Sequence, residues 1–180
     1  MSVLYSIIAI DEELTQEKND FWAQLGIEIP MGTTSRYPTP SEIRQALNEM
    51  TEYTKDYFIT EKAWDVDIYE TASYDQKLHR IDGKYATIYS IGPALSESLP
   101  LPIYFHGGWE EVNLEIVLRL TYFTGPLMIM CDVDTVPLLV SPGAELTDLL
   151  SRWKKQREIA RLSSGVDDIT NIPPSPGKDS

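Results

Sequence analysis

The stretch AWDVDIYE, residues 63–70, alternates between apolar and polar side chains. The apolar members are Trp64, Val66 and Ile68, and the polar members are Asp65, Asp67 and Tyr69. In an extended chain, successive side chains point to opposite faces, so this period of two predicts a strand with one buried face and one solvated face. Such a pattern is typical of antiparallel sheets, in which one face packs on the core and the other can meet water.

The neighbouring segments extend this strand into an antiparallel sheet. In KLHRIDGKYATIYSIG, residues 77–92, Asp82-Gly83 separates two β-prone runs and predicts a hairpin with a type I′ turn. Further strands are predicted at VLYSIIAI (3–10), IYFH (103–106), LMIMC (127–131) and VPLLV (136–140). We therefore expect a mainly antiparallel sheet of about five to seven strands.

Helical signals are clearest in TPSEIRQALNEM, residues 39–50. Thr39 stands at the N-cap, Pro40 at the first helical position and Glu42 three residues after the cap, which together form a capping box. Three other helices are expected. They are TQEKNDFWAQLG (15–26, with Leu14, Phe21 and Leu25 roughly on one face), WEEVNLEIVLRLTYF (109–123) and a last helix that begins near Ser141-Pro142 and has Leu146, Leu149, Leu150 and Trp153 on its inner side.

These patterns predict a single α+β domain over residues 1–162, with three or four helices covering the sheet. Residues 163–180 mix Ser, Gly, Pro and Asp with few apolar side chains, a composition that favours a disordered tail. A chain of 180 residues with 42% hydrophobic residues can bury a core of ordinary size without disulfides or metals.

The charge balance restricts the classes of partner. The net charge is -13, and residues 1–144 hold 9 basic against 22 acidic side chains. Because affinity for nucleic acid comes largely from cations that contact phosphates, an acidic body argues against a nucleic-acid ligand and favours a basic protein partner. The helix at residues 145–162 is locally basic, with 5 cations against 3 acids, so we also consider a homo-oligomer formed through it.

One cysteine, Cys131, excludes an intrachain disulfide and favours a reducing, cytoplasmic location. The apolar run at residues 3–10 is too short for a membrane span and lacks the basic flank of a signal peptide, so no membrane association is expected. The apolar neighbours of Cys131 predict a buried thiol rather than a nucleophile.

The segment YFHGGWEE, residues 104–111, is the best candidate for a site. His106 is a candidate general base, with Glu110 and Glu111 as catalytic partners. His106 with Asp132 and Asp134 is a candidate metal set, although stable zinc sites usually need three or four ligands. Two glycines before a helix suggest an anion site, but carboxylates already occupy the first helical turn and would repel an anion.

The alternative interpretation of this segment is structural: His106 ends a strand, the glycines make a tight turn and Trp109 folds onto the core. This interpretation is favoured, since no GxSxG, P-loop or HExxH motif is present and no cofactor is expected. In the same way, the aspartates of DVDT (132–135) are better explained as turn residues that bond to nearby backbone.

The sequence therefore favours a non-enzymatic protein-binding module. Its expected binding surface consists of Asp65, Asp67, Tyr69 and Trp109. One concrete form is an immunity or antitoxin-like protein that neutralises a basic partner, which is an analogy at the level of class. The alternatives are an enzyme or small-ligand or metal-binding protein with a site near His106, Trp109, Asp132 and Asp134, and a subunit of a larger assembly.

Overall fold

The computed structural model describes residues 3–75, 80–81 and 83–163. Its elements, in chain order, are β1 (Leu4–Ala9), α1 (Glu12–Gln24), α2 (Pro40–Asn48), β2 (Tyr53–Ile59), β3 (Trp64–Glu70), a 3-10 turn (Thr71–Ser73), β4 (Tyr74–Asp75), β5 (Arg80–Ile81), β6 (Tyr85–Ser90), β7 (Ile103–His106), α3 (Glu110–Thr124), β8 (Leu127–Cys131), β9 (Pro137–Val140) and α4 (Leu146–Ser163).

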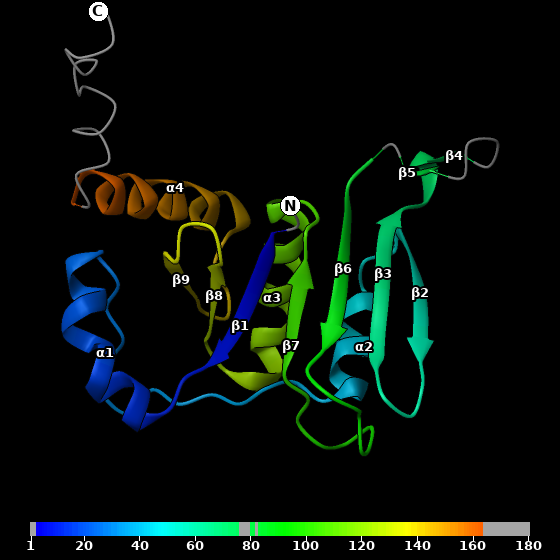
Figure 1. Ribbon diagram of the computed structural model, residues 1–180, viewed down its shortest axis with the longest axis horizontal. Coiled ribbons are helices and arrows are strands. Elements are labelled where there is room, and N and C mark those ends of the chain that lie inside the picture. Colours follow the sequence, from blue (N-terminus) through cyan, green and yellow to red (C-terminus); the bar gives the residue numbers. More distant parts are fainter. Residues whose placement is uncertain (1–2, 76–79, 82, 164–180) are drawn as a thin grey trace, which may run out of the picture.

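Seven strands form one open sheet in the order β2-β3-β6-β7-β1-β8-β9, and every neighbouring pair is antiparallel (Figure 1). The predicted α+β class, the strand number and the four helices are confirmed. The first strand of the chain lies in the interior of the sheet, between β7 and β8, which fits its apolar sequence.

The predicted hairpin around Asp82-Gly83 is wrong. The strand before the turn, β5, pairs with β4 in a separate two-stranded sheet, whereas β6 pairs with β3 and β7. A turn signal involves only a few residues, whereas the partner of a strand depends on all the side chains that it buries. The buried side chains of β6, Ala86 and Ile88, lie opposite Ile68 and Val66 of β3. Residues 76–79 and Asp82 itself lie outside the described residues.

The predicted alternation of β3 is confirmed. Trp64, Val66 and Ile68 are each at most 1% exposed, and the polar residues between them are half-buried. Helices α2, α3 and α4 cover the face of the whole sheet to which these side chains point, with α3 in contact with both of the other helices. The apolar face of β3 therefore belongs to the main core of the protein.

The first helix packs on the opposite face of the sheet, at one end only. Trp22 and Leu25, with the following Ile27 and Ile29, contact Met128 of β8 and form a second, smaller core. The helix begins at Glu12, earlier than predicted, and its buried residue is Trp22. Of the residues predicted to share one face of this helix, Leu25 is buried, whereas Phe21 is 54% exposed.

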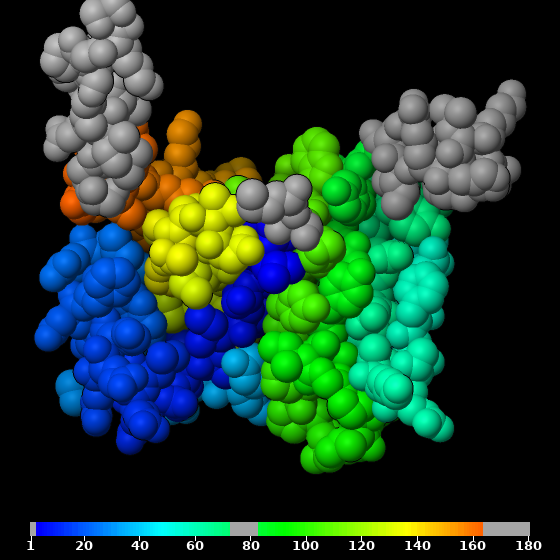
Figure 2. All heavy atoms as spheres, in the orientation of Figure 1, coloured from blue at the N-terminus to red at the C-terminus, as the bar shows by residue number. Residues whose placement is uncertain are grey.

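Because α1 packs at one end only, none of the described helices covers the rest of this face of the sheet. The strands β2, β3, β6 and β7 have α2 and α3 behind them, whereas in front of them the strands themselves form the surface (Figure 2). We call this surface the open face.

The capping box at α2 is present as predicted. The Glu42 amide donates to the Thr39 hydroxyl over 3.1 Å, and the Thr39 amide donates to the Glu42 carboxylate over 2.9 Å. The Arg36 guanidinium, 2.6 Å from Glu42, lowers the pKa of that carboxyl through a hydrogen bond. These contacts fix the start of the helix against the preceding loop.

The last helix begins later than its sequence pattern indicates, at Leu146 instead of near Ser141-Pro142. Gly143 has φ +82°, a left-handed conformation that cannot continue a right-handed helix. Leu149 and Trp153 are buried as expected, with Leu146 and Leu150 packed beside them. Ser163, the first residue of the predicted tail, is the final residue of α4. The rest of that tail, residues 164–180, lies outside the described residues.

Among the described helices, none is both long enough and apolar enough to cross a membrane.

The two faces of the sheet should respond differently to truncation. Replacing Ile68, which is 1% exposed, by alanine removes packed atoms from the main core and should lower the free energy of unfolding by about 2–5 kcal/mol. Thr87→Ala, on the open face of the neighbouring strand, should change it by about 0.5 kcal/mol or less. Urea denaturation measures both values, and equal losses would contradict the proposed division of the faces.

Candidate functional site

The open face consists of side chains from four strands, β2, β3, β6 and β7, which are far apart in the sequence at their extremes. Residues directly opposite each other in an antiparallel pair point to the same face, so the register identifies its members. They are Thr54, Asp56 and Phe58 of β2; Asp65, Asp67 and Tyr69 of β3; Tyr85, Thr87 and Tyr89 of β6; and Tyr104 and His106 of β7. The face thus combines carboxylates with phenol rings.

The carboxylates lie at the β2 side of the open face. Asp56 and Asp67 are directly opposite each other across the two strands, an arrangement in which like charges repel. The Tyr69 hydroxyl donates to the Asp56 carboxylate over 3.0 Å, and the Asp65 carboxylate accepts a 3.4 Å hydrogen bond from the Ser90 amide. These contacts orient two of the three carboxylates, and no ion pair among the described residues compensates their negative charge.

The aromatic rings lie toward β7. The ring centroids of Tyr89 and Tyr104 are 5.6 Å apart in a stacked arrangement, and the His106 ring meets Tyr89 edge-on at 5.5 Å. Burial raises the pKa of Tyr89, and the charges of Asp67 and Asp65 add to the effect. The phenol therefore keeps its proton and can act as a hydrogen-bond donor beside the aspartates.

No lysine or arginine occupies a strand position of the open face within the described part of the chain. Of the residues expected to form the binding surface, Asp65, Asp67 and Tyr69 lie together on it. The sequence pattern did not single out Asp56, Tyr89 and Tyr104. Only the register between strands places these residues on the same face as the aspartates of β3, and register is not readable from a single segment.

The HGGW segment is a junction between β7 and α3. Gly107 and Gly108 have φ +66° and +83°, and the Gly107 amide donates to the Val3 carbonyl. A side chain at Gly108 would lie 2.9 Å from the Tyr85 carbonyl oxygen, so only glycine fits there. The tight turn was predicted correctly, but Trp109 does not fold onto the core. Its side chain is 47% exposed, with the Lys84 ammonium 6.0 Å from its ring centroid.

The candidate catalytic glutamates are held in ion pairs. The Arg157 guanidinium of α4 donates to both oxygens of Glu110, over 2.9 and 2.6 Å, and Lys84 donates to Glu111 over 2.8 Å. Arg157 also lies 2.6 Å from Asp134 and 3.9 Å from the Trp153 ring centroid. One cation therefore joins α3, α4 and the turn between β8 and β9, a structural role that no local sequence pattern indicates.

The candidate metal ligands are not assembled. Asp134 pairs with Arg157, and Asp132 accepts a hydrogen bond from the Leu4 amide over 3.0 Å. Leu4 is the residue opposite His106, so β1 lies between the histidine and Asp132. Within the described ranges, no group of three or more His, Cys, Asp or Glu side chains could hold a metal ion.

Cys131 is buried, and burial raises the pKa of its thiol, which disfavours the reactive thiolate.

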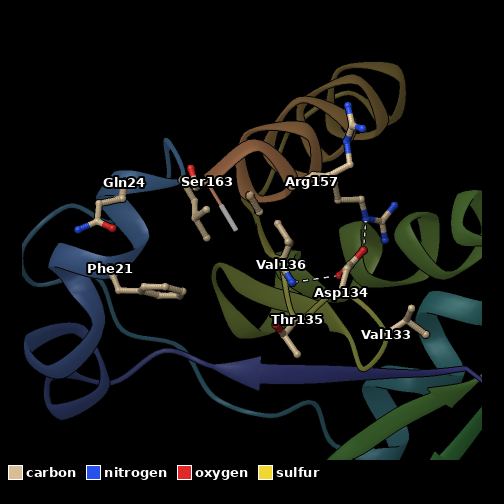
Figure 3. Close-up of a pocket in the computed structure, with 11 residues that line it drawn as sticks. Phe21, Gln24, Val133, Asp134, Thr135, Val136, Arg157 and Ser163 are labelled. Carbon is tan, nitrogen blue, oxygen red and sulfur yellow. Dashed lines mark hydrogen bonds and ion pairs between the residues drawn. The ribbon is translucent and has the colours of Figure 1, made fainter. Parts of the chain in front are cut away.

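A separate hollow of about 660 Å³ lies between α1, the β8–β9 turn and the end of α4 (Figure 3). Phe21 projects toward it from α1, while Asp134 and Arg157 form its polar wall. Thr135 in the same turn has φ +56°, an uncommon conformation for a β-branched residue. The Arg157 guanidinium already pairs with Glu110 and Asp134, so this cation is not available to bind an anionic ligand in the hollow.

The junction provides a test of the glycine geometry. Gly108→Ala combines a left-handed backbone with a steric clash and should lower the free energy of unfolding by about 2–4 kcal/mol. Gly143→Ala is the matched control, because Gly143 has the same φ but open space around it, and should cost about 1 kcal/mol. Thermal or urea unfolding compares the two, and similar losses would refute the close approach at Tyr85.

The Arg157 network should stabilise the fold measurably. Arg157→Met leaves two partly buried carboxylates, Glu110 and Asp134, without their cation and should lower the free energy of unfolding by about 2 kcal/mol. The exposed Arg152 on the same helix is the control, for which Arg152→Met should change it by about 0.5 kcal/mol or less. Urea denaturation measures the free energy of unfolding of both variants, and equal values would contradict this structural role of Arg157.

Comparisons with protein-family models, with curated proteins and with solved structures gave no match to this chain.

Proposed function

We propose that this protein is a non-enzymatic binding module that holds a basic protein partner on its open face. The observation that carries the proposal is the composition of that face. Three aspartates, four tyrosines and one histidine lie on an uncovered sheet surface whose described strand positions include no cation.

Aromatic residues suit such a surface because each combines a large apolar area with a polar tip. Tyrosine has only two main side-chain torsions, so it contributes contact area with little loss of conformational entropy on binding. The Tyr89 and Tyr104 rings are already packed against each other, so their positions are largely set before a partner arrives. Preorganisation of this kind lowers the free energy that ordering would otherwise cost.

The charge of the partner follows from the aspartates. Asp56 and Asp67 repel each other in the free protein, and a lysine or arginine placed between them would relieve that repulsion. The whole protein, and not the open face alone, is acidic, with a net charge of -13. This charge would accelerate encounter with a positively charged protein. Both effects favour a basic partner over a neutral or acidic one.

A specific form of this proposal is an immunity or antitoxin-like inhibitor, in which the acidic and aromatic face covers a cationic cleft of a nuclease toxin. The support is chemical, since carboxylates and phenols match the groups that such a cleft uses to bind phosphates. We further propose a cytoplasmic location, for which the support is the single cysteine, buried in β8.

The alternative of a small-ligand or metal site near His106 has less support. Glu110, Glu111 and Asp134 are engaged by cations, and the described residues bring no third ligand to His106. A homo-oligomer through the basic helix would rely on Arg152, Lys154 and Lys155, which are exposed. Arg157 of the same helix already forms an ion pair within the chain.

The proposal is tested by a pair of charge-matched variants. Asp65→Asn with Asp67→Asn removes two charges from the open face and keeps the shape of the side chains. Glu12→Gln with Glu13→Gln removes two charges from exposed positions at the start of α1. We expect the first variant to weaken binding of the basic partner about tenfold or more, and the second less than threefold.

The partner is recovered from the source cells by affinity capture at low and at high salt, and its affinity for each variant is then measured by calorimetry. The expected complex is weakened by salt. Recovery of no basic protein at either salt, or equal loss of affinity in the two double variants, would count against the proposal.

A further inference from the structure

We propose that the partner binds by strand addition, with an extended segment of the basic protein pairing along the free edge of β2 as an eighth strand of the sheet. This inference rests on the proposed function and adds a mode of recognition to it. Strand addition supplies affinity through backbone hydrogen bonds and selectivity through alternate side chains.

The free edge of β2 has the properties of a template. The strand is the outermost of the sheet, it is seven residues long and it contains no proline. Its register with β3 is constant from Tyr53 to Ile59, so no bulge twists the edge away. The opposite edge, β9, is only four residues long and begins with Pro137, features that protect an edge from pairing.

The hydrogen bonds at the two ends of β2 identify which backbone groups face outward. The Thr71 amide donates to the Glu52 carbonyl, and the Thr60 amide donates to the Ala63 carbonyl, so even-numbered positions bond to β3. In an antiparallel pair, residues alternate between bonding to the neighbour and facing away from it. The N–H and C=O groups of Lys55, Tyr57 and Ile59 therefore point away from the sheet.

Within the part of the chain that the structure describes, β2 pairs only with β3, and no other backbone hydrogen bond reaches these three residues. The amide of Tyr53 is different, because it donates to the Met50 carbonyl in the preceding turn. Three consecutive outward positions are thus open to a strand.

The side chains beside this edge indicate what the added strand would carry. Asp56 and Phe58 are exposed on the open face next to it, and Phe58 is 54% exposed. A strand placed there would set one side chain opposite Asp56 and another, two residues along, opposite Phe58. A lysine or arginine fits opposite Asp56, and an arginine guanidinium can lie over the Phe58 ring, so cations at alternate positions suit this pair. The other aspartates, Asp65 and Asp67, lie one strand further from the edge, on β3.

Charge also argues against a second copy of this chain as the occupant. Pairing two copies along β2 would join two sheets whose faces both carry Asp56, Asp65 and Asp67, in molecules of net charge -13. A cationic segment experiences attraction from the same groups. We therefore take the occupant to be an extended segment of the basic partner.

Hydrogen exchange of individual amides, measured by NMR, tests the pattern. The probe is the acetylated and amidated peptide TVKVRVT, and the control is the acidic peptide TVEVEVT. With the basic probe at saturation, exchange at Lys55, Tyr57 and Ile59 should slow about tenfold or more, because these amides gain partners. Exchange at Asp56 and Phe58, which already bond to β3, should change less than twofold, and the acidic peptide should protect none of them.

Two variants separate backbone from side-chain recognition. Ile59→Pro removes one outward N–H group and should weaken binding of the basic peptide about tenfold, whereas Ile59→Ala keeps that group and should weaken it less than threefold. Asp56→Asn leaves the backbone unchanged and should lower affinity through lost charge alone. Unchanged exchange in the main core, at Val66 and Ile88, confirms that the proline variant stays folded.

The outcomes distinguish this inference from the proposed function. Protection spread over the open face without alternation in β2, or no binding of the basic peptide while the partner is still held through Asp65 and Asp67, would overturn strand addition alone. Protection of Lys55, Tyr57 and Ile59 that grows with protein concentration in the absence of peptide would identify a second copy as the occupant and overturn it as well. Alternating protection by the basic peptide, lost in Ile59→Pro, supports it.

Discussion

The rest of the structure depends on the strict alternation of β3, a strand that described helices cover on one face only. Trp64, Val66 and Ile68 fill the main core, and a slip of one residue would bury Asp65 and Asp67 in their place. Burying two unpaired carboxylates costs far more than any local preference could return. The aspartates therefore help to fix the register, and they remain on the open face as a consequence.

A second consequence concerns the positive charges. The described ion pairs are Arg36–Glu42, Arg44–Glu97, Lys84–Glu111, Arg119 with Glu49 and Glu115, and Arg157 with Glu110 and Asp134. None of them includes an aspartate of the open face. The cations in these described pairs connect helices, loops and the junction after β7. None of these pairs neutralises the negative charge of Asp56, Asp65 or Asp67.

Local patterns were enough to predict most of the elements, because alternation and capping act within a few residues. The capping box at Thr39 and the glycine turn after His106 are examples. The sequence did not reveal features that depend on distant contacts. The Asp82-Gly83 signal said nothing about the pairing of β3 with β6, and the ion pair between Glu110 and Arg157 joins residues 47 positions apart. The burial of Trp22 likewise depends on packing against Ile10 and Met128, which are distant from it in the sequence.

The composition of the open face also suggests how its parts would divide the work of recognition. Asp56 is exposed and Asp65 and Asp67 are half-buried, so their interactions with a partner would be screened by water and salt, which favours a contribution to encounter rate and selectivity. Lasting affinity needs groups that lose contact with water, and the stacked Tyr89 and Tyr104 supply them. Backbone bonds along β2 would add orientation, since a strand can pair only in line with the edge. Charge would then select the partner, and the aromatic rings and the edge would retain it.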